Sequence, residues 1–453
     1  MFTTIDEKRI DKALAKEPTS RDFARVLAKS ESLERLSMED VAILLNNPGR
    51  HTDELLFSRA REIKKSIYGK RIVLFAPLYI SNLCANDCLY CAFRTSNRHL
   101  ARTRLTMEEV RRETQALLDS GQRRALVVSG ESCTEREFEH IIESINTIYS
   151  VDDGKGGIRR LNVNIAPVTN EQFVRLKEAQ IGTYQLFQET YNRETYHKVH
   201  PRGPKADYEY RLGTIDRALE AGLDDLGIGV LFGLHDYRRE VLSLLSHVEH
   251  LEATHGLGPH TISVPRLEPA QGCDLASSPP WPVSDGDFLR IIAILRMAVP
   301  YTGIILSTRE SPEIRRRAFA LGVSQVSAGS RTNPGGYSST DALEQFSLGD
   351  HRSLDEVVRD ILEQGYIPSF CTSCYRLGRT GLDFMDLAKP GDIGKKCAPN
   401  GILTLKEYLS DYASEETRAL GESVIATMHS EAPDPLLDRL LLRVENGERD
   451  IFV

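Results

Sequence analysis

Residues 71–93, RIVLFAPLYISNLCANDCLYCAF, join a run of apolar residues directly to three closely spaced cysteines. The run at 71–80 is apolar at consecutive positions, which is typical of a parallel strand that is buried on both faces. Cys84, Cys88 and Cys91 follow it with gaps of three and two residues. The segment therefore predicts a first strand whose end leads straight into a metal-binding loop.

The alternation of an apolar run with an amphipathic helix pattern continues along the chain. Some helices carry clear end signals, such as an N-cap at Thr106 and a terminating Gly121, or Ser311 followed by Pro312. Strands are expected at 71–80, 124–130, 159–166, 182–189, 225–232, 261–267, 303–308 and 323–328, and helices at 106–121, 134–150, 170–180, 207–222, 238–254, 283–298, 311–321 and 353–365. Eight such repeats predict a (β/α)8 TIM-type barrel. An open doubly wound sheet is the alternative, but no GxGxxG motif follows the first strand.

Three regions follow from this pattern. Residues 1–70 form an N-terminal helical extension, and 71–352 form the barrel. Residues 353–453 complete the barrel and then become loop-rich and mostly helical, with a second cysteine trio, Cys371, Cys374 and Cys397. In a barrel, the loop after the first strand lies at the C-terminal mouth, where active sites are built.

Composition restricts the location and the partners. The net charge of −8 argues against nucleic acid or an anionic membrane as the main partner. The N-terminus lacks a signal-peptide pattern, and no apolar run is long enough to span a bilayer, so we expect a cytoplasmic protein. Closely spaced cysteines in a reducing compartment are more often metal ligands than disulfides, whereas Cys133 and Cys273 stand alone and are interpreted as non-ligand thiols.

Each trio supplies three thiolates and no obvious fourth ligand. Structural zinc usually has four protein ligands, so a zinc site is the weaker interpretation of either trio. A [4Fe–4S] cluster held by three cysteines leaves one iron open to a small molecule. Tyr90 would give the first site an aromatic wall, and His99 lies eight residues beyond Cys91.

The pattern CxxxCxxC after the first strand of a barrel resembles the radical S-adenosylmethionine (SAM) superfamily. The resemblance implies a [4Fe–4S] cluster whose open iron binds SAM. It also implies SAM contacts from Ser129, Gly130 and Glu131 at the end of the second strand, where a glycine allows close approach and a carboxylate can pair with the SAM ammonium group.

From about residue 70 to 415, the chain more narrowly resembles the tyrosine-cleaving radical SAM maturases of [FeFe]-hydrogenase. The matching stretches include PLYISNLCANDCLYC, RRLNVNIAP, FQETY, DDLGIGVLFGL, GPHTISVPR, STRES, SRTNPGGY and SFCTSCYRLGRTG. The barrel alone is also similar to the thiamine-pathway tyrosine lyases, which lack the C-terminal trio. One departure is Ser132 in VSGES, where the maturases more usually have an acidic residue, as in AGED.

The resemblance implies a two-stage reaction. An adenosyl radical takes hydrogen from the amino group of L-tyrosine, and the Cα–Cβ bond breaks to give p-cresol and dehydroglycine. A second, auxiliary [4Fe–4S] cluster with an additional iron (possibly [5Fe–5S]) and bound L-cysteine then collects carbon monoxide and cyanide. The iron product would serve the hydrogenase H-cluster, with other hydrogenase maturases and a reduced ferredoxin or flavodoxin as protein partners.

Residue types suggest where these ligands bind. A tyrosine carboxylate requires a guanidinium or hydroxyl donors, and the candidates at the ends of two strands are Ser307, Arg309, Ser330 and Arg331. Further contacts with SAM or tyrosine are expected from Gln188, Glu189 and Asn164, the last with Asn162 on the same strand face. The resemblance makes His260 the ligand of the additional iron, which places the second cluster at the barrel bottom and requires an internal channel.

Two other functions remain open on the residues. One is a tyrosine lyase of the 2-iminoacetate synthase type that serves thiamine synthesis, with a purely structural second cluster. The other is a nonenzymatic iron–sulfur scaffold or a zinc-stabilised binding module. The products formed from tyrosine distinguish all three.

Overall fold

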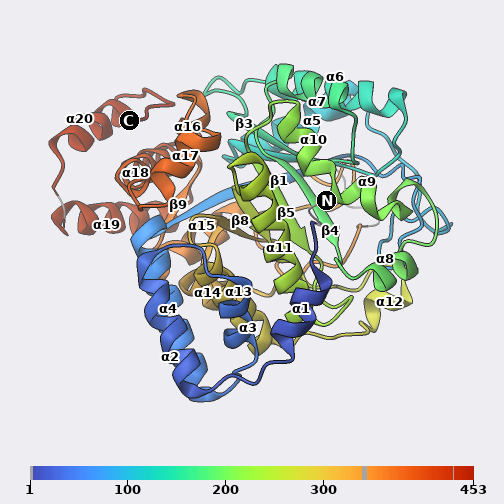
Figure 1. Cartoon of the computed structure of the whole chain (residues 1–453). Helices are drawn as coiled ribbons and strands as arrows, with labels where there is room; N and C mark the ends of the chain where they lie inside the picture. The colour runs from blue at the N-terminus through green and yellow to red at the C-terminus, as the bar shows by residue number, and fades with distance from the viewer. Residues whose placement is uncertain (1–3, 339–343, 432) are drawn as a thin grey trace.

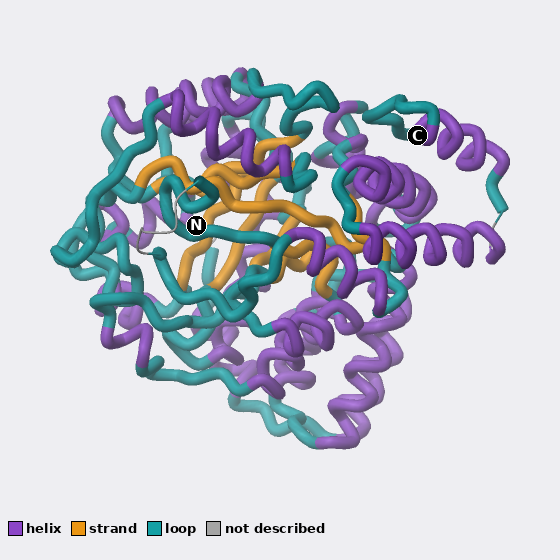
Figure 2. The backbone as a smooth tube through the Cα atoms, turned by 180° about the vertical axis from the view of Figure 1, so that it is seen from behind, coloured by secondary structure: helices purple, strands orange, loops and turns teal. Residues whose placement is uncertain are grey.

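Figure 1 presents the computed structural model of the chain, which describes residues 4–338, 344–431 and 433–453. Figure 2 shows the strands at the centre, with helices and loops around them. The strands are β1 (Arg71–Ser81), β2 (Arg124–Ser129), β3 (Arg160–Asn164), β4 (Tyr184–Glu189), β5 (Leu226–Val230), β6 (Thr261–Ser263), β7 (Gly303–Leu306), β8 (Val323–Ser327) and β9 (Ile367–Ser369).

Eight parallel strands close into a barrel. Each of β1 to β7 pairs with the next strand, and β8 pairs back with β1. This arrangement confirms the predicted (β/α)8 barrel and excludes an open sheet. All eight predicted strands are present, because their uninterrupted apolar runs suit positions covered on both sides.

Helices between the strands follow the predicted pattern with small changes. The expected helix 207–222 is divided at Gly213 into two shorter helices. The barrel helices are α5 (Met107–Asp119), α6 (Glu135–Tyr149), α7 (Asn170–Glu178), α8 (Arg193–Val199), α9 (Tyr208–Leu212), α10 (Thr214–Glu220), α11 (Tyr237–His255), α12 (Asp274–Ser277), α13 (Asp285–Ala298), α14 (Pro312–Leu321) and α15 (Leu354–Glu363), with a 3-10 turn, η2, at Pro204–Ala206.

Both termini add helices to the barrel. The N-terminal set is α1 (Glu7–Leu14), α2 (Ser20–Lys29), η1 (Ser30–Ser32), α3 (Met38–Leu45) and α4 (Arg50–Tyr68). The C-terminal set is α16 (Ser373–Arg376), α17 (Gly381–Ala388), α18 (Gly394–Asp411), α19 (Glu415–Glu431) and α20 (Pro435–Glu445). In Figure 1 these two groups lie at different edges of the molecule.

Strand β9 is an element that the sequence pattern does not predict. Its residues 367–369 pair in parallel with Arg71–Val73, the first three residues of β1, whereas β8 pairs with the next part of that strand. The first part of β1 lies at the bottom of the barrel, opposite the cysteine loop. The pairing therefore carries the start of the C-terminal region to the barrel bottom.

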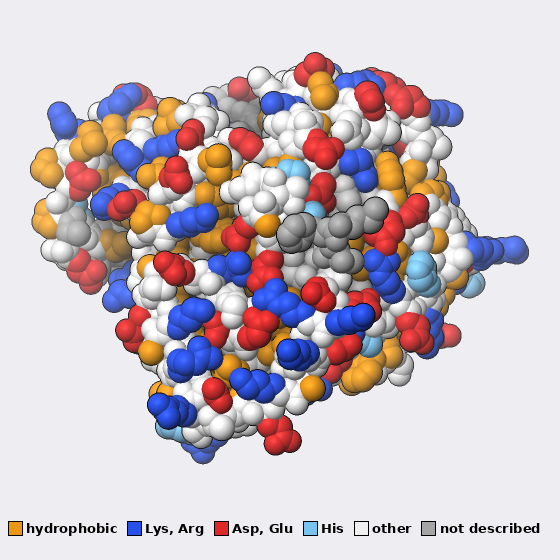
Figure 3. Space-filling view, viewed as in Figure 1, with side chains coloured by type: hydrophobic (Ala, Val, Ile, Leu, Met, Phe, Trp, Pro, Cys, Tyr) orange, Lys and Arg blue, Asp and Glu red, His pale blue; other side chains and the backbone are white. Residues whose placement is uncertain are grey.

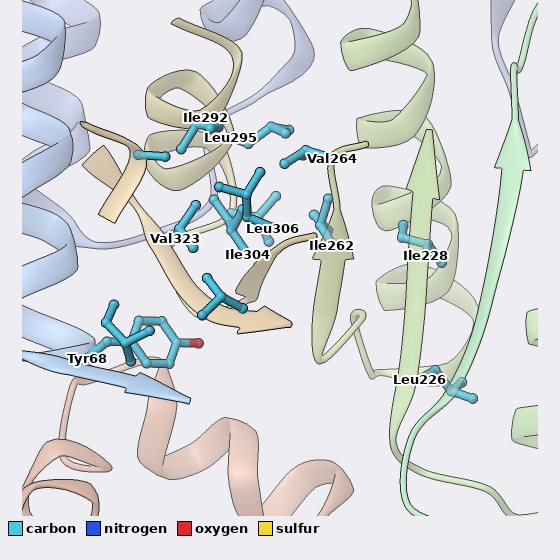
Figure 4. Close-up of a cluster of buried hydrophobic side chains, with 14 of the residues drawn as sticks. Tyr68, Leu226, Ile228, Ile262, Val264, Ile292, Leu295, Ile304, Leu306 and Val323 are labelled. Atoms are coloured by element: carbon cyan, nitrogen blue, oxygen red, sulfur yellow. The ribbon is translucent and has the colours of Figure 1, made fainter. Parts of the chain in front are cut away.

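The main core lies between the strands and the surrounding helices. Figure 4 shows Ile292 and Leu295 of α13 near Ile304 and Leu306 of β7. All four side chains are at most 1% exposed. Burying one such side chain contributes roughly 1.5–3 kcal/mol, so the barrel wall is a rigid support for the loops at its two ends.

The surface is mixed in charge. Figure 3 shows Lys and Arg beside Asp and Glu over most of one face. Exposed apolar side chains occur on α20, where Leu436 and Leu442 are 46% and 57% exposed. Among the described residues, no helix combines the length and the apolar character needed to cross a membrane.

Candidate active site and metal centres

The first cysteine trio lies in the loop between β1 and α5, at the C-terminal mouth. The guanidinium of Arg102 holds this loop, because it donates to the carbonyl oxygens of Asn82 and Phe93 at 3.1 and 2.7 Å. Burial raises the thiol pKa values to about 11 for Cys84 and to about 12 for Cys88 and Cys91, and neighbouring thiols raise them further. The three thiols therefore lie close enough to affect one another, and bound iron would be needed to deprotonate them at neutral pH.

Within the described ranges, no three Cys, His, Asp or Glu side chains are positioned to hold a single metal ion. The donor set of the first trio nevertheless fits an iron–sulfur cluster, since it consists of three thiols from one loop, and the Asp87 carboxylate between them is bonded to Arg94, Ser96 and Arg202. Two donors already point at these sulfur atoms: the backbone N–H of Asn86 to Cys84 Sγ at 3.4 Å and Gln345 Nε2 to Cys91 Sγ at 3.5 Å.

Gly130 lets the end of β2 pack against the cysteine loop. A Cβ atom at this position would lie 2.3 Å from the carbonyl oxygen of Leu83. The backbone N–H of Gly130 donates to Ser81 O, and the N–H of Ala85 donates to Glu131 O. The glycine is thus explained by close approach of the protein's own loop, and the Ser129 hydroxyl donates to the neighbouring Gly130 carbonyl at 3.1 Å.

Glu131 lies in a buried network of charges beside the first trio. Its carboxylate accepts from Asn86 Nδ2 and Arg211 Nη1, both at 3.2 Å, and from Lys205 Nζ at 3.4 Å. Burial would raise the pKa of Glu131, but Arg211 and Lys205 together hold it below its ordinary value. Glu131 is therefore a carboxylate at neutral pH. Glu189 shares the same cations, with Lys205 Nζ at 2.7 Å.

The sequence gives no signal for two of these cations. Lys205 and Arg211 are 74 and 80 residues away from Glu131 in the chain. They lie in the irregular stretch around η2 and α9, where no periodic pattern indicates which side chains face inward. A search for basic residues between the fourth and fifth strands could have suggested them, but could not have paired them with Glu131.

A cavity of about 170 Å³ lies inside the mouth of the barrel next to Cys91. Its wall includes Tyr90, Asn164 and Glu189 from the predicted set. Aromatic and polar side chains complete it, among them Phe75, Tyr79, Gln185, Phe187, Ser263, Ser327, Gln345 and Phe346. Two glycines of β5 help to keep the barrel interior open, since a Cβ at Gly229 would lie 2.6 Å from Phe187.

Arg309 is the basic residue of this cavity. It lines the wall with Ser307 and Ser330, and its guanidinium lies 3.3 Å from the centre of the Phe346 ring. In the described part of the chain, no acidic side chain lies within ion-pair distance of Arg309, although burial lowers its pKa. The Ser330 hydroxyl is buried and has no hydrogen-bond partner among the residues that the structure describes. An anionic ligand would satisfy both groups.

Arg331 differs from its predicted position. Ser330 and Thr332 line the cavity, but Arg331 lies between them and points to a separate groove between α5 and α15. Its Nη1 donates to the Ser330 carbonyl at 3.0 Å. Residues 330–332 lie in an irregular segment after β8, so the sequence pattern does not indicate which of these side chains faces the cavity. Arg309 therefore lines the cavity at the mouth, whereas Arg331 does not.

The other predicted contacts are buried around the same mouth. Tyr90 bonds through its hydroxyl to His200 Nε2 at 2.7 Å, and Asn164 Nδ2 donates to Gln185 O at 3.0 Å. Asn162 lies deeper and accepts from the N–H of Thr183. Gln188 is 4% exposed with an unpartnered Nε2, and it is not part of the cavity wall.

The second trio lies at the barrel bottom. Cys371 follows β9, Cys374 lies in α16 and Cys397 lies in α18. Burial would lower the pKa of Arg71, the first residue of β1, but all three thiols raise it above its ordinary value. Burial raises the pKa of the Cys397 thiol to about 11. Arg71 lowers this pKa, and the other two thiols raise it. The structure thus places the three cysteines near one guanidinium, although within the described ranges they are not positioned to hold a single metal ion.

His260 lies at the same end of the barrel, just before β6. It is 5% exposed, and neither ring nitrogen has a hydrogen-bond partner among residues 4–338, 344–431 and 433–453. Its ring packs on Phe384 of α17 with centroids 4.9 Å apart, and Asp225 Oδ1 is 4.0 Å from Nδ1. Asp225 Oδ1 is also unpartnered. An imidazole with two unused nitrogens in a buried polar site is suited to a metal ligand.

Comparisons with known proteins agree with this geometry. Residues 78–247 match the Radical SAM superfamily model, and residues 263–367 match the Biotin and Thiamin Synthesis associated domain. The 2-iminoacetate synthase of Escherichia coli is 32% identical over 352 residues, which cover 77% of this chain and 90% of that protein.

Two solved structures are similar over nearly the whole chain. The crystal structure of HydG, described as a maturase of the [FeFe]-hydrogenase, is 48% identical, with a TM-score of 0.96 and coverage of 99% of this chain and 100% of its own. HydG from Carboxydothermus hydrogenoformans is 41% identical, with a TM-score of 0.86 and coverage of 96% and 97%.

Proposed function

Because this chain belongs to the radical SAM superfamily, we propose that it is a tyrosine lyase of [FeFe]-hydrogenase maturation. In this reaction L-tyrosine is cleaved to p-cresol and dehydroglycine, and the second fragment yields carbon monoxide and cyanide. The second cysteine trio, at the barrel bottom, would hold an auxiliary cluster that supplies an iron site for these products on their way to the H-cluster. L-cysteine at the additional iron, an electron donor and other maturases are the further partners.

The observation that carries the proposal is the presence of two cysteine trios at opposite ends of one barrel. The similarity to HydG covers 99% of the chain, whereas the similarity to 2-iminoacetate synthase covers 77%. A lyase that only supplies dehydroglycine needs the upper site alone. The lower site, with His260 and its two free nitrogens, fits a second chemical stage.

Cys84, Cys88 and Cys91 would hold a [4Fe–4S] cluster with SAM, which supplies one-electron cleavage of SAM to an adenosyl radical. Glu131, kept ionised by Lys205 and Arg211, would accept from the SAM ammonium group. Tyr90 lines the cavity beside Cys91 and would shield that side of the cluster from water.

Arg309 would bind the tyrosine carboxylate, and Ser307 and Ser330 would add hydroxyl donors. The aromatic part of the cavity wall, including Phe75 and Phe187, would enclose the phenol ring. In this orientation the amino group would lie in the same cavity, whose wall includes Cys91 of the cluster loop.

At the barrel bottom, Cys371, Cys374 and Cys397 would hold the auxiliary cluster, and His260 the additional iron. The cavity at the mouth includes none of these residues. The polar side chains of Gln185 and Thr261 lie deeper in the barrel interior, where a Cβ at Gly227 would meet both. We propose that dehydroglycine or its products pass through this region.

Anaerobic turnover of the reconstituted enzyme with SAM and tyrosine tests the proposal. Formation of p-cresol, cyanide and carbon monoxide together supports it. A matched pair of variants separates the two sites: Cys88→Ser should abolish all products, whereas Cys397→Ser should still form p-cresol without carbon monoxide. His260→Ala should retain the cluster of the second trio and lose one iron per chain.

The 32% identity to 2-iminoacetate synthase favours a second candidate, a lyase that supplies dehydroglycine for thiamine synthesis. Wild-type enzyme that makes p-cresol but no carbon monoxide, with or without Cys397, would favour this function. Absence of 5′-deoxyadenosine under all conditions would contradict both candidates.

A further inference from the structure

A cluster of exposed cations surrounds the loop that carries the first cysteine trio. Two segments contribute: residues 94–104, with four arginines and no acidic residue, and residues 197–205, with two lysines, one arginine and no acidic residue. The whole chain has 65 acidic and 57 basic residues, so these segments run against its overall charge. We call the cations that reach the surface here the basic face: Arg94, Arg98, Arg102, Lys198 and Arg202.

Hydrogen bonds fix both segments to the cysteine loop. The N–H of Arg94 donates to Cys91 O at 3.1 Å, and the N–H of Leu89 donates to Val199 O at 3.0 Å. Because three residues of chain span at most about 11 Å, Arg94 and Lys198 lie within a short distance of the trio. The basic face is therefore the protein surface beside the first cluster site.

The positive charge of this face is only partly compensated. Asp87 is 2% exposed and lies beneath Arg94 and Arg202, which both pair with it, yet the Arg202 side chain remains 71% exposed. Arg102 bonds to carbonyl oxygens, which leave its charge in place. Among the described residues, Arg98 and Lys198 form no ion pair.

We propose that the basic face is the docking surface for a protein electron carrier with an acidic surface around its redox group. This inference rests on the proposed function, since cleavage of SAM consumes one electron that no group of this chain supplies. One electron passes from the reduced carrier to the cluster held by the trio, so the carrier is oxidised by one electron and the cluster is reduced by one. No bond forms between the two proteins. The rate of electron transfer falls steeply with the distance between the two redox groups. The carrier must therefore dock close to the first trio, and the basic face is the surface beside it.

The charges suit a transient complex of this kind. Complementary surface charges accelerate encounter and give a strong dependence on salt, while each exposed pair adds little affinity. A carrier must also dissociate after each transfer, and weak, salt-sensitive binding allows this. The face lies outside the cavity that we assign to tyrosine. In the part of the chain that the structure describes, Arg98 and Lys198 have no ion-pair partner that would give them a structural role.

The test uses a double variant, Arg98→Glu with Lys198→Glu, in the reconstituted enzyme. Its control is Arg50→Glu, a charge reversal on α4 at a side chain that is 94% exposed. Binding of a bacterial flavodoxin is measured at low salt and at 0.5 M salt, where the Debye length is roughly half its value at physiological ionic strength. Formation of 5′-deoxyadenosine is then measured with reduced flavodoxin and, separately, with dithionite.

We expect the double variant to weaken flavodoxin binding on the order of tenfold at low salt and to reduce its salt dependence. Its flavodoxin-driven rate should fall similarly, while its dithionite-driven rate and the Arg50→Glu control stay at wild-type values. Unchanged flavodoxin binding, or equal loss with both reductants, would overturn the docking surface. Tighter binding of a random RNA oligonucleotide, lost in the same variant, would also overturn it. If dithionite yields no 5′-deoxyadenosine even in wild type, the proposed function itself fails.

Discussion

Replacing Arg309 by alanine should separate tyrosine binding from SAM cleavage. The guanidinium lines the cavity without an acidic partner in the described part of the chain, and it is held in place against the Phe346 ring. In the variant, the tyrosine carboxylate would enter the cavity without a cation to bind it. Arg331→Ala is the matched control, because the side chain at 331 faces a different groove.

The size of the effect follows from the interaction lost. A hydrogen bond to a charged group contributes about 1.5–3 kcal/mol, and an unpaired buried charge costs up to about 5 kcal/mol. The cavity is small, at about 170 Å³, and leaves little room for water to replace the guanidinium. We therefore expect a loss near 3 kcal/mol, which is roughly a 150-fold fall in kcat/KM for tyrosine. Arg309→Lys should recover part of it, since lysine keeps the charge but not the bidentate geometry.

The assay follows p-cresol as tyrosine is varied, and 5′-deoxyadenosine in the absence of tyrosine. In Arg309→Ala, tyrosine-independent cleavage of SAM should stay within about twofold of wild type, because the first trio and Glu131 are untouched. Arg331→Ala should resemble wild type in both measurements. The reasoning would be refuted if Arg331→Ala carried the large defect, or if Arg309→Ala lost SAM cleavage and tyrosine cleavage to the same extent.

Three further predictions concern the supports of the site. Gly130→Ala should reduce iron loading at the first trio, measured as iron per chain in a Cys397→Ser background, because the new Cβ would lie 2.3 Å from the backbone oxygen of Leu83; full loading would contradict this packing. Gly229→Ala should lower the free energy of unfolding by about 1–3 kcal/mol through overpacking against Phe187, as measured by urea titration, and should slow p-cresol formation. Burial raises the pKa of Glu240 from 4.5 to about 7, so the folded state retains a proton that the unfolded chain releases; this contribution, about 3 kcal/mol, is complete below pH 4.5 and is lost as the pH rises through 7. Urea titrations at pH 5 and pH 8 should show that loss in wild type and a flatter profile in Glu240→Gln, and equal profiles would contradict it.

Local sequence patterns determined the barrel and the position of the first cysteine trio. An apolar run followed by an amphipathic helix depends on neighbouring residues alone, and all eight strands were predictable for that reason. The spacing of Cys84, Cys88 and Cys91 is likewise local. The pairing of β9 with β1 was not predictable, since three residues of strand carry little pattern and the partner strand begins 296 positions earlier, at Arg71 against Ile367.

Tertiary structure alone decided which side chains share a site. It joined Glu131 to Lys205 and Arg211, chose Arg309 over Arg331 for the cavity, and left both nitrogens of His260 buried without partners. Each of these facts depends on contacts between residues far apart in the chain or on the direction in which a side chain leaves an irregular segment. Residue types and spacing limit the possible chemistry, but only the packed barrel fixes the distances and the exclusion of water on which that chemistry depends.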